Sequence, residues 1–387
     1  MIKICMIATI SLTLKSFVVE TAKHLHEKCG YDITLICSED VAFAASLPSY
    51  IHFIPVHMAR GIDASALASI REFKRIFREQ KFDLIQYSTP NAACYASIAA
   101  KAIKAPIRLY CQWGIRYVGM NGIKRSVFRQ IEKMVCRNST AVRAVSPMNR
   151  QFGIDEGLYP PDKVKVIGHG GTIGVDMGDY NIEQKEAWRD EFRDLYGIRP
   201  DVFVFGYAGR LSKDKGSNEL ITAFRQLVNE ASVPLRLMLV GDNKSNGEIE
   251  PSLMEWIHAA PSVVEVGKID NALMKCYYSC FDVLVHPTYR EGFGMVIQEA
   301  GAMGIPTITT RIPGASEVME DNKSCLLVKP KDATDLLLAM KKLLSHPEKT
   351  AALGREAFLR TQLLYERGIM LQFQEQDYLT LMQKLID

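Results

Sequence analysis

The sequence of 387 residues has no hydrophobic run that approaches the ~18–20 apolar residues of a membrane-spanning helix. Residues 1–14 are apolar, but they include Lys3 and have no small-residue cleavage site, so we interpret them as a first strand rather than a signal peptide. Paired Cys-x-x-Cys motifs are absent, and the odd number of cysteines, nine, favours reduced thiols over a disulfide framework. We therefore expect a cytoplasmic protein.

The sequence also has little net charge. Lys and Arg number 47 against 44 Asp and Glu, a net charge of +3, which together with the lack of interleaved aromatics argues against nucleic-acid binding. Residues 101–150, however, hold eleven Lys or Arg and one acid, Glu132. On a predicted helix over 123–137, the cations lie largely off an apolar stripe. They face either an anionic membrane surface or only solvent: Lys124, Arg125, Arg129, Lys133 and Arg137.

β-branched apolar runs alternate with helix-period segments along the whole chain, which is typical of parallel sheets covered on both faces. Predicted strands in the first half cover 2–8, 33–37, 84–87, 107–111, 141–145 and 164–167. The second half repeats the pattern at 202–206, 235–240, 263–266, 283–286, 307–309 and 325–328. We predict two Rossmann-like, doubly wound α/β domains facing one another across a cleft, residues 1–178 and 179–366, with a helix over 367–387 packing back on the first.

Two segments of the second half carry chemistry. GYAGRLSKDKG, residues 206–216, follows a strand and precedes a helix, where backbone N–H groups can bind phosphate, and Arg210 and Lys215 add two cations. The alternative is two solvated loop cations. In HPTYREGFGMVIQEAGAMGIPTI, residues 286–308, Glu291 lies at a strand's carboxyl end and Glu299 on the following helix. Such carboxylates can accept hydrogen bonds from sugar hydroxyls, although each alone also fits an exposed or capping acid.

Together these residues resemble glycosyltransferase family 4, retaining sugar transferases of the two-domain GT-B architecture. The resemblance rests on GRLSKDKG, on EGFGMVIQE with seven residues between its two glutamates, and on Gly301, Gly304 and Pro306. It implies that Arg210 and Lys215 bind the donor diphosphate and act with Glu291 as catalytic residues, while Glu299 binds the ribose. The other implied donor-binding residues are Lys268, Gly292, Phe293, Gly294, Met295 and Val296.

The glycine-rich segment VIGHGGTIGVD, residues 166–176, resembles the interdomain segment of family members that build bacterial surface polysaccharides on lipid carriers. The resemblance implies that Gly170 and Gly171 let this loop run close to the donor. Many members carry a His-Gly pair after the strand that ends near Tyr110, but here the sequence reads Cys-Gln-Trp-Gly, which puts Trp113 in the histidine's place. Trp113 either stacks on a sugar ring or is a buried structural residue.

The remaining acceptor-binding predictions are Arg116, which we expect to pair with an acceptor phosphate, and Thr13, Lys15 and Ser16 in the first loop. No Asp-x-Asp triplet occurs, so we expect no metal and no cofactor, with Arg210 and Lys215 supplying the positive charge.

The function this implies is retaining transfer of a sugar from a UDP-linked donor to a lipid-linked saccharide, in O-antigen or capsule synthesis at the inner face of the membrane. The alternatives are a nucleotide-sugar 2-epimerase of the same architecture and a non-catalytic nucleotide-sugar-binding protein.

Overall fold

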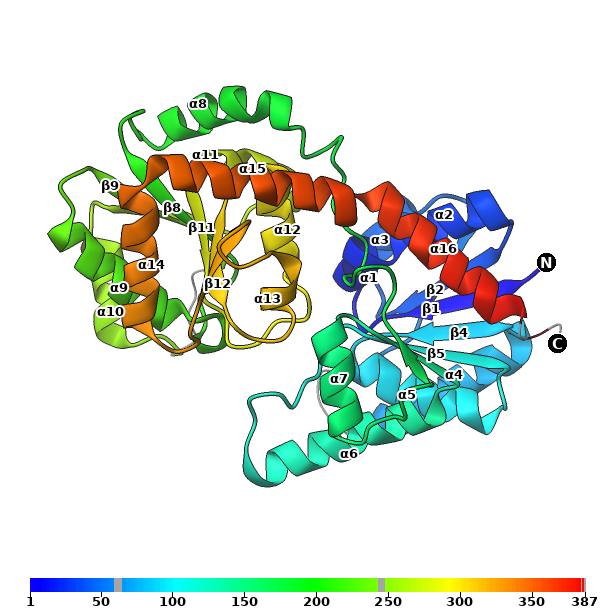
Figure 1. Cartoon of the computed structure of the whole chain (residues 1–387). Helices are drawn as coiled ribbons and strands as arrows, with labels where there is room; N and C mark the ends of the chain where they lie inside the picture. Colours follow the sequence, from blue (N-terminus) through cyan, green and yellow to red (C-terminus); the bar gives the residue numbers. More distant parts are fainter. Residues whose placement is uncertain (59–64, 243–247, 384, 386–387) are drawn as a thin grey trace. The chain divides into compact units, whose positions relative to one another are not determined.

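The chain folds into two α/β units, each built on one parallel sheet (Figure 1). The structure is a computed structural model and describes residues 1–58, 65–242, 248–383 and 385. The first unit comprises Met1–Ile173 and Gly368–Asp387, and the second comprises Gly174–Arg367. The prediction of two doubly wound parallel sheets is confirmed.

The first sheet has seven strands among the described residues, in the order β3-β2-β1-β4-β5-β6-β7. Its strands are nearly continuous apolar runs, as expected for a sheet buried on both faces. The strand order reverses between β1 and β4, and ligands bind outside the carboxyl ends of strands at such a switch point. The strands are β1 (Lys3–Ile7), β2 (Asp32–Cys37), β3 (Ile51–Pro55), β4 (Leu84–Tyr87), β5 (Ile107–Gln112), β6 (Ala141–Ala144) and β7 (Val164–Lys165).

Helices cover both faces of this sheet. On one face α4 and α5 bury Phe73, Phe77 and Ala96 against strand residues, and on the other α1, α2 and α16 bury Leu14 and Tyr378. The helices of the first unit are α1 (Ser11–Phe17), α2 (Val19–Cys29), α3 (Val41–Ser46), α4 (Ser65–Gln80), α5 (Pro90–Ala102), α6 (Gly122–Asn138), α7 (Pro147–Asp155) and α16 (Arg367–Gln383).

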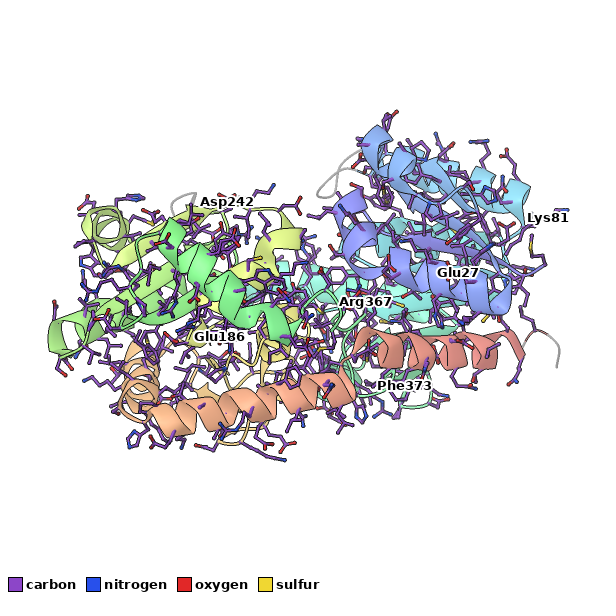
Figure 2. All side chains as sticks on the ribbon, turned by 90° about the horizontal axis from the view of Figure 1, so that it is seen from above. Glu27, Lys81, Glu186, Asp242, Arg367 and Phe373 are labelled. Atoms are coloured by element: carbon purple, nitrogen blue, oxygen red, sulfur yellow. The ribbon has the colours of Figure 1, made fainter. Side chains whose placement is uncertain are left out.

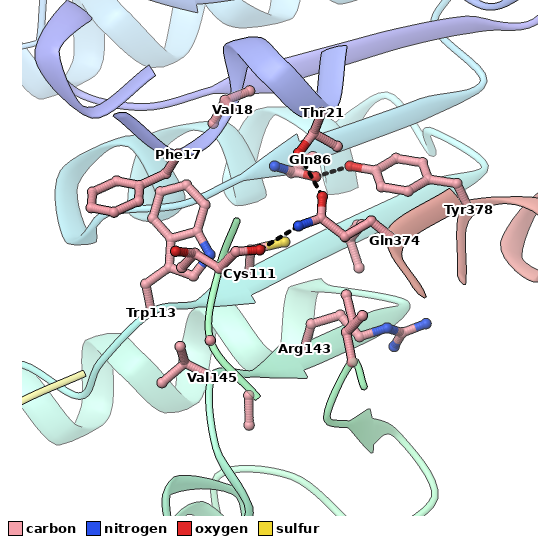
Figure 3. Close-up of a pocket in the computed structure, with 15 residues that line it drawn as sticks. Phe17, Val18, Thr21, Gln86, Cys111, Trp113, Arg143, Val145, Gln374 and Tyr378 are labelled. Carbon is pink, nitrogen blue, oxygen red and sulfur yellow. Dashed lines mark hydrogen bonds between the residues drawn. The ribbon is translucent and has the colours of Figure 1, made fainter. Parts of the chain in front are cut away.

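Polar contacts reinforce the packing of α16 on the first unit. The guanidinium of Arg143 on β6 donates two hydrogen bonds to Asp377, at 2.7 and 2.8 Å. Thr21 on α2 donates to Gln374 at 2.6 Å, and Tyr378 donates to Gln86 (Figure 3). Elsewhere on the same helix, Phe373 (Figure 2) lies edge-on to the ring of His169.

The second sheet has six strands in the described part of the chain, in the order β10-β9-β8-β11-β12-β13. One face carries α9, α10 and α14, and the other carries α8, α11 and α12. The strands are β8 (Phe203–Ala208), β9 (Leu235–Val240), β10 (Val263–Gly267), β11 (Val283–His286), β12 (Thr307–Thr310) and β13 (Cys325–Val328). The helices are α8 (Lys185–Leu195), α9 (Ser217–Glu230), α10 (Pro251–Ala259), α11 (Met274–Cys280), α12 (Met295–Ala302), α13 (Ala315–Val318), α14 (Ala333–Ser345) and α15 (Pro347–Leu364).

The structure corrects one local expectation. The segment predicted as a first loop forms α1, because Leu14 is fully buried and anchors a short helix that ends at Phe17. Several further elements have no counterpart in the sequence prediction: β3, α3, α7, α10, α13 and α15.

Candidate functional site

A cavity of about 400 Å³ lies at the carboxyl ends of β8, β9 and β10 in the second unit. This edge lies beside the point where the strand order reverses between β8 and β11. Four residues predicted to bind the donor line the cavity: Arg210, Lys268, Val296 and Glu299. The Arg210 side chain is 58% exposed, and its carbonyl accepts a hydrogen bond from the buried Tyr207 hydroxyl at 2.7 Å. The loop is therefore fixed while the guanidinium stays accessible.

Lys215 and Glu291 form an ion pair across two loops of the second unit. The Lys215 Nζ donates to Glu291 Oε2 at 2.7 Å, and His286 Nε2 lies 3.1 Å from the same oxygen. Burial raises the pKa of Glu291, but Lys215 and His286 outweigh it and hold that pKa well below its usual range. Glu291 is therefore an anion, and Lys215 retains N–H donors for a further anionic partner.

The two loops meet through their backbones. The Tyr289 N–H donates to the Asp214 carbonyl at 2.8 Å. Gly216 has a φ of +69°, and a Cβ at this position would lie 2.0 Å from the Pro287 carbonyl oxygen. Only glycine fits both the left-handed conformation and this close approach, so Gly216 is needed to bring Lys215 to Glu291.

The second carboxylate, Glu299, is held from α11. The Tyr278 hydroxyl donates to Glu299 Oε2 at 2.8 Å, and both residues line the cavity. Burial raises the pKa of Glu299, against the lowering effects of Tyr278 and Arg367. The cavity therefore presents a carboxylate with one oxygen already bonded.

The turn between β11 and α12 holds the remaining predicted donor residues. Gly294 caps α12 in the left-handed conformation, followed by Met295 and Val296 in its first turn. The Gly292 N–H donates to Glu291 Oε1 at 3.1 Å. Phe293 is 4% exposed and packs edge-on against Tyr365, so only its backbone can reach a ligand.

Comparison with known proteins accounts for this arrangement. Residues 189–360 match the family model of Glycosyl transferases group 1, and residues 3–146 match that of Glycosyl transferase 4-like proteins. The two models together cover most of the chain, which is therefore a glycosyltransferase. It is 26% identical over 358 residues to the capsular polysaccharide biosynthesis glycosyltransferase CapM of Staphylococcus aureus, covering 92% of each chain.

Solved structures share the fold of this glycosyltransferase. Anabaena Alr3699/HepE in complex with UDP and glucose matches with a TM-score of 0.80 at 20% identity, over 98% of this chain and 100% of that one. A putative UDP-N-acetylglucosamine 2-epimerase from Listeria monocytogenes matches with a TM-score of 0.65 at 12% identity, over 96% and 94%. Because the epimerase has the same architecture, the fold alone does not choose between the two reactions.

The predicted acceptor residues of the glycosyltransferase lie in the first unit. Thr13, Lys15 and Ser16 are on α1, and Trp113 follows β5 with its ring centroid 5.5 Å from that of Phe17 (Figure 3). The Arg116 guanidinium lies 4.5 Å from the ring centroid of Phe128 on α6, a cation–π contact.

Gly170 and Gly171 also belong to the first unit, where the Gly171 N–H donates to the Val145 carbonyl at 2.8 Å. Their approach to the donor stays a prediction.

The five cations predicted on the basic helix α6 separate into two groups. Arg125 and Arg129 each lie within 2.7 Å of a Glu156 carboxylate oxygen. Lys124 and Arg137 are exposed and Lys133 is half-buried. Two of the five are thus already paired with an acid in this unit of the glycosyltransferase.

Sequence reasoning assigned no role to His286 or Tyr278, the two residues that hold the carboxylates. Both are buried in apolar segments and resemble ordinary core residues, so the only signal was their position just before the glutamate motif. In the described residues no group of three or more His, Cys, Asp or Glu could hold a metal ion, and no helix is long and apolar enough to cross a membrane.

Proposed function

We propose that this glycosyltransferase moves a sugar from a UDP-linked donor to a hydroxyl of a lipid-linked saccharide in surface-polysaccharide synthesis, with retention at the anomeric carbon. The observation that carries the proposal is the arrangement of Arg210, Lys215, Glu291 and Glu299 around the carboxyl edge of one sheet, beside a cavity of about 400 Å³. The capsular role of CapM and the UDP bound to HepE support the acceptor class and the donor base.

In this proposal the cations bind the diphosphate. Lys215 donates one N–H to Glu291 and has others for phosphate oxygens, while Arg210 offers its exposed fork. These charges offset the charge that develops on the leaving group, so we propose that turnover needs no metal. The departing phosphate oxygen takes the proton of the acceptor hydroxyl. No separate general base is then required.

Product analysis tests the proposal. Wild type is incubated with UDP-sugars and a lipid-linked acceptor, and the new linkage is read by NMR. We expect retained stereochemistry and turnover that survives EDTA. An inverted linkage contradicts retention, and loss of turnover with the chelator contradicts metal independence. Conversion of the UDP-sugar in the absence of acceptor instead identifies an epimerase.

We also propose that the start of α6 rests on an anionic membrane surface. Ile123 is 85% and Val127 45% exposed one helical turn apart, with exposed Lys124 beside them. Apolar side chains can enter the headgroup region, and each cation there contributes about 1 kcal/mol.

Vesicle cosedimentation tests this membrane contact. We expect the double variant Ile123→Ser, Val127→Ser to lose most binding to phosphatidylglycerol vesicles. The matched control is Leu67→Ser, which removes a 65% exposed leucine from α4 of the same unit and should bind like wild type. The proposal is contradicted if all three proteins bind phosphatidylglycerol vesicles equally. It is also contradicted if wild type binds phosphatidylcholine vesicles as well as phosphatidylglycerol vesicles.

A further inference from the structure

Tyr278 and Glu299 form a buried pair at the wall of the cavity. Tyr278 is 0% exposed, and its hydroxyl donates to Glu299 Oε2 at 2.8 Å. Among the residues that the structure describes, no partner other than Tyr278 hydrogen-bonds the Glu299 carboxylate, so Oε1 is left for a ligand in the cavity.

The tyrosine ring itself is rigidly placed. It lies edge-on to Phe281, with centroids 5.8 Å apart, and the end of α11 is tied to α8. Arg193 on α8 donates to the Cys280 carbonyl at 2.7 and 3.0 Å, and Arg189 donates to the Ser279 carbonyl at 3.3 Å. The phenol therefore reaches Glu299 from a scaffold with little freedom to move.

A phenol hydroxyl suits the role of hydrogen-bond donor to Glu299 better than a cation would. A buried carboxylate tends to take up a proton, and as an acid it would lose acceptor strength. A neutral hydroxyl donor favours the ionised carboxylate and fixes its orientation. It adds no charge that would compete for the donor's phosphates.

We infer that Tyr278 is a positioning residue that turns Glu299 so that its free oxygen accepts hydrogen bonds from the ribose hydroxyls of the nucleotide. This inference rests on the proposed function, together with the role in binding the ribose that the family resemblance implies for Glu299. Tyr278 itself touches neither the sugar nor the phosphates in this arrangement.

Calorimetric binding of UDP and 2′,3′-dideoxy-UDP to the full chain tests the inference. If GDP or ADP binds wild type more tightly than UDP, that nucleotide and its dideoxy counterpart replace the pair. Tyr278→Phe removes one oxygen and keeps the ring. We expect it to weaken binding of the ribonucleotide on the order of 10-fold, as for loss of a hydrogen bond to a charged group. Binding of the dideoxy nucleotide should be unchanged. In a Glu299→Gln background, Tyr278→Phe should cause no further loss of affinity.

Tyr277→Phe is the matched control. Tyr277 lies on the same helix, is 5% exposed, and its hydroxyl is 3.0 Å from that of Tyr196. It should bind both nucleotides like wild type. If Tyr278→Phe weakens both nucleotides equally, or neither, the inference is overturned. If wild type and Glu299→Gln bind both nucleotides alike, or if none of the three ribonucleotides binds wild type, the ribose contact in the proposed function fails first.

Discussion

The Lys215–Glu291 pair links the chemistry of the second unit to its stability. Both side chains are at most about a quarter exposed, and the pKa of Glu291 is held well below its ordinary value of about 4.3 in an unfolded chain. A carboxyl with a lowered folded-state pKa contributes stability that is fully present above the unfolded pKa. That stability is lost as the pH falls through the folded pKa.

Replacing Lys215 by Met should reverse this contribution. Burial is then opposed only by His286, so the pKa of Glu291 rises from its wild-type value and the anion is held with less compensation at neutral pH. We expect the second unit to lose about 1–3 kcal/mol at pH 7.5, roughly 3–10 °C in Tm, and less at pH 5, where the variant's Glu291 takes up a proton. Thermal unfolding at the two pH values measures this. The control is Lys213→Met, which replaces an exposed lysine in the same turn. A stability difference between wild type and Lys215→Met that is the same at both pH values would contradict the argument.

At the level of elements, the loop between β8 and α9 depends on the close approach of Gly216 to Pro287. Gly216→Ala must accommodate both a φ of +69° and a Cβ 2.0 Å from a carbonyl oxygen. We expect a loss of ~3 kcal/mol or more in stability and at least 10-fold in kcat/KM, because the two loops are forced apart.

Gly197→Ala separates the two causes of this loss. Gly197 is in the same unit and has a φ of +61°, but nothing lies within 4 Å of its Cβ position. We expect only about 1 kcal/mol from backbone strain and unchanged kcat/KM. Denaturant unfolding and steady-state kinetics compare the two variants. Equal effects would show that conformation alone, and not the contact with Pro287, matters at residue 216.

The elements that the sequence predicted well are those with strong periodicity. The buried strands of both sheets are continuous apolar runs, whereas the edge strand β3 reads IHFIP, with an exposed histidine and a terminal proline, and escapes the pattern. Glu291 and Glu299 were identified as site candidates because their spacing is local. The pairing of Arg125 and Arg129 with Glu156 was not predicted, because Glu156 caps the next helix, 31 and 27 positions further along the chain.

In the whole molecule, the chain leaves the first unit after Ile173 and returns to it at Gly368. The returning helix α16 completes a core in which Tyr378, Leu381 and Met382 are buried. The first unit is therefore not complete until the end of the chain has docked on it.

The pair of Arg143 and Asp377 should decide how firmly α16 docks. Arg143 is 6% exposed, so Asp377→Ala leaves a buried cation without its partner, at a cost of about 3–5 kcal/mol. We expect the first unit's unfolding transition to fall by roughly 10 °C and α16 to become sensitive to limited proteolysis. Glu375 also lies on α16, is partly exposed and pairs with His24 on α2. Glu375→Ala should therefore cost less than about 1 kcal/mol in stability.

The double variant Arg143→Met, Asp377→Leu separates charge from packing. If the loss in Asp377→Ala comes from the stranded cation, replacing both partners by apolar side chains should restore most of the stability, because no uncompensated charge then remains buried. If the double variant is as unstable as Asp377→Ala, the ion pair is not what holds α16. Burial of Tyr378 and its neighbours in the shared core would then carry the docking.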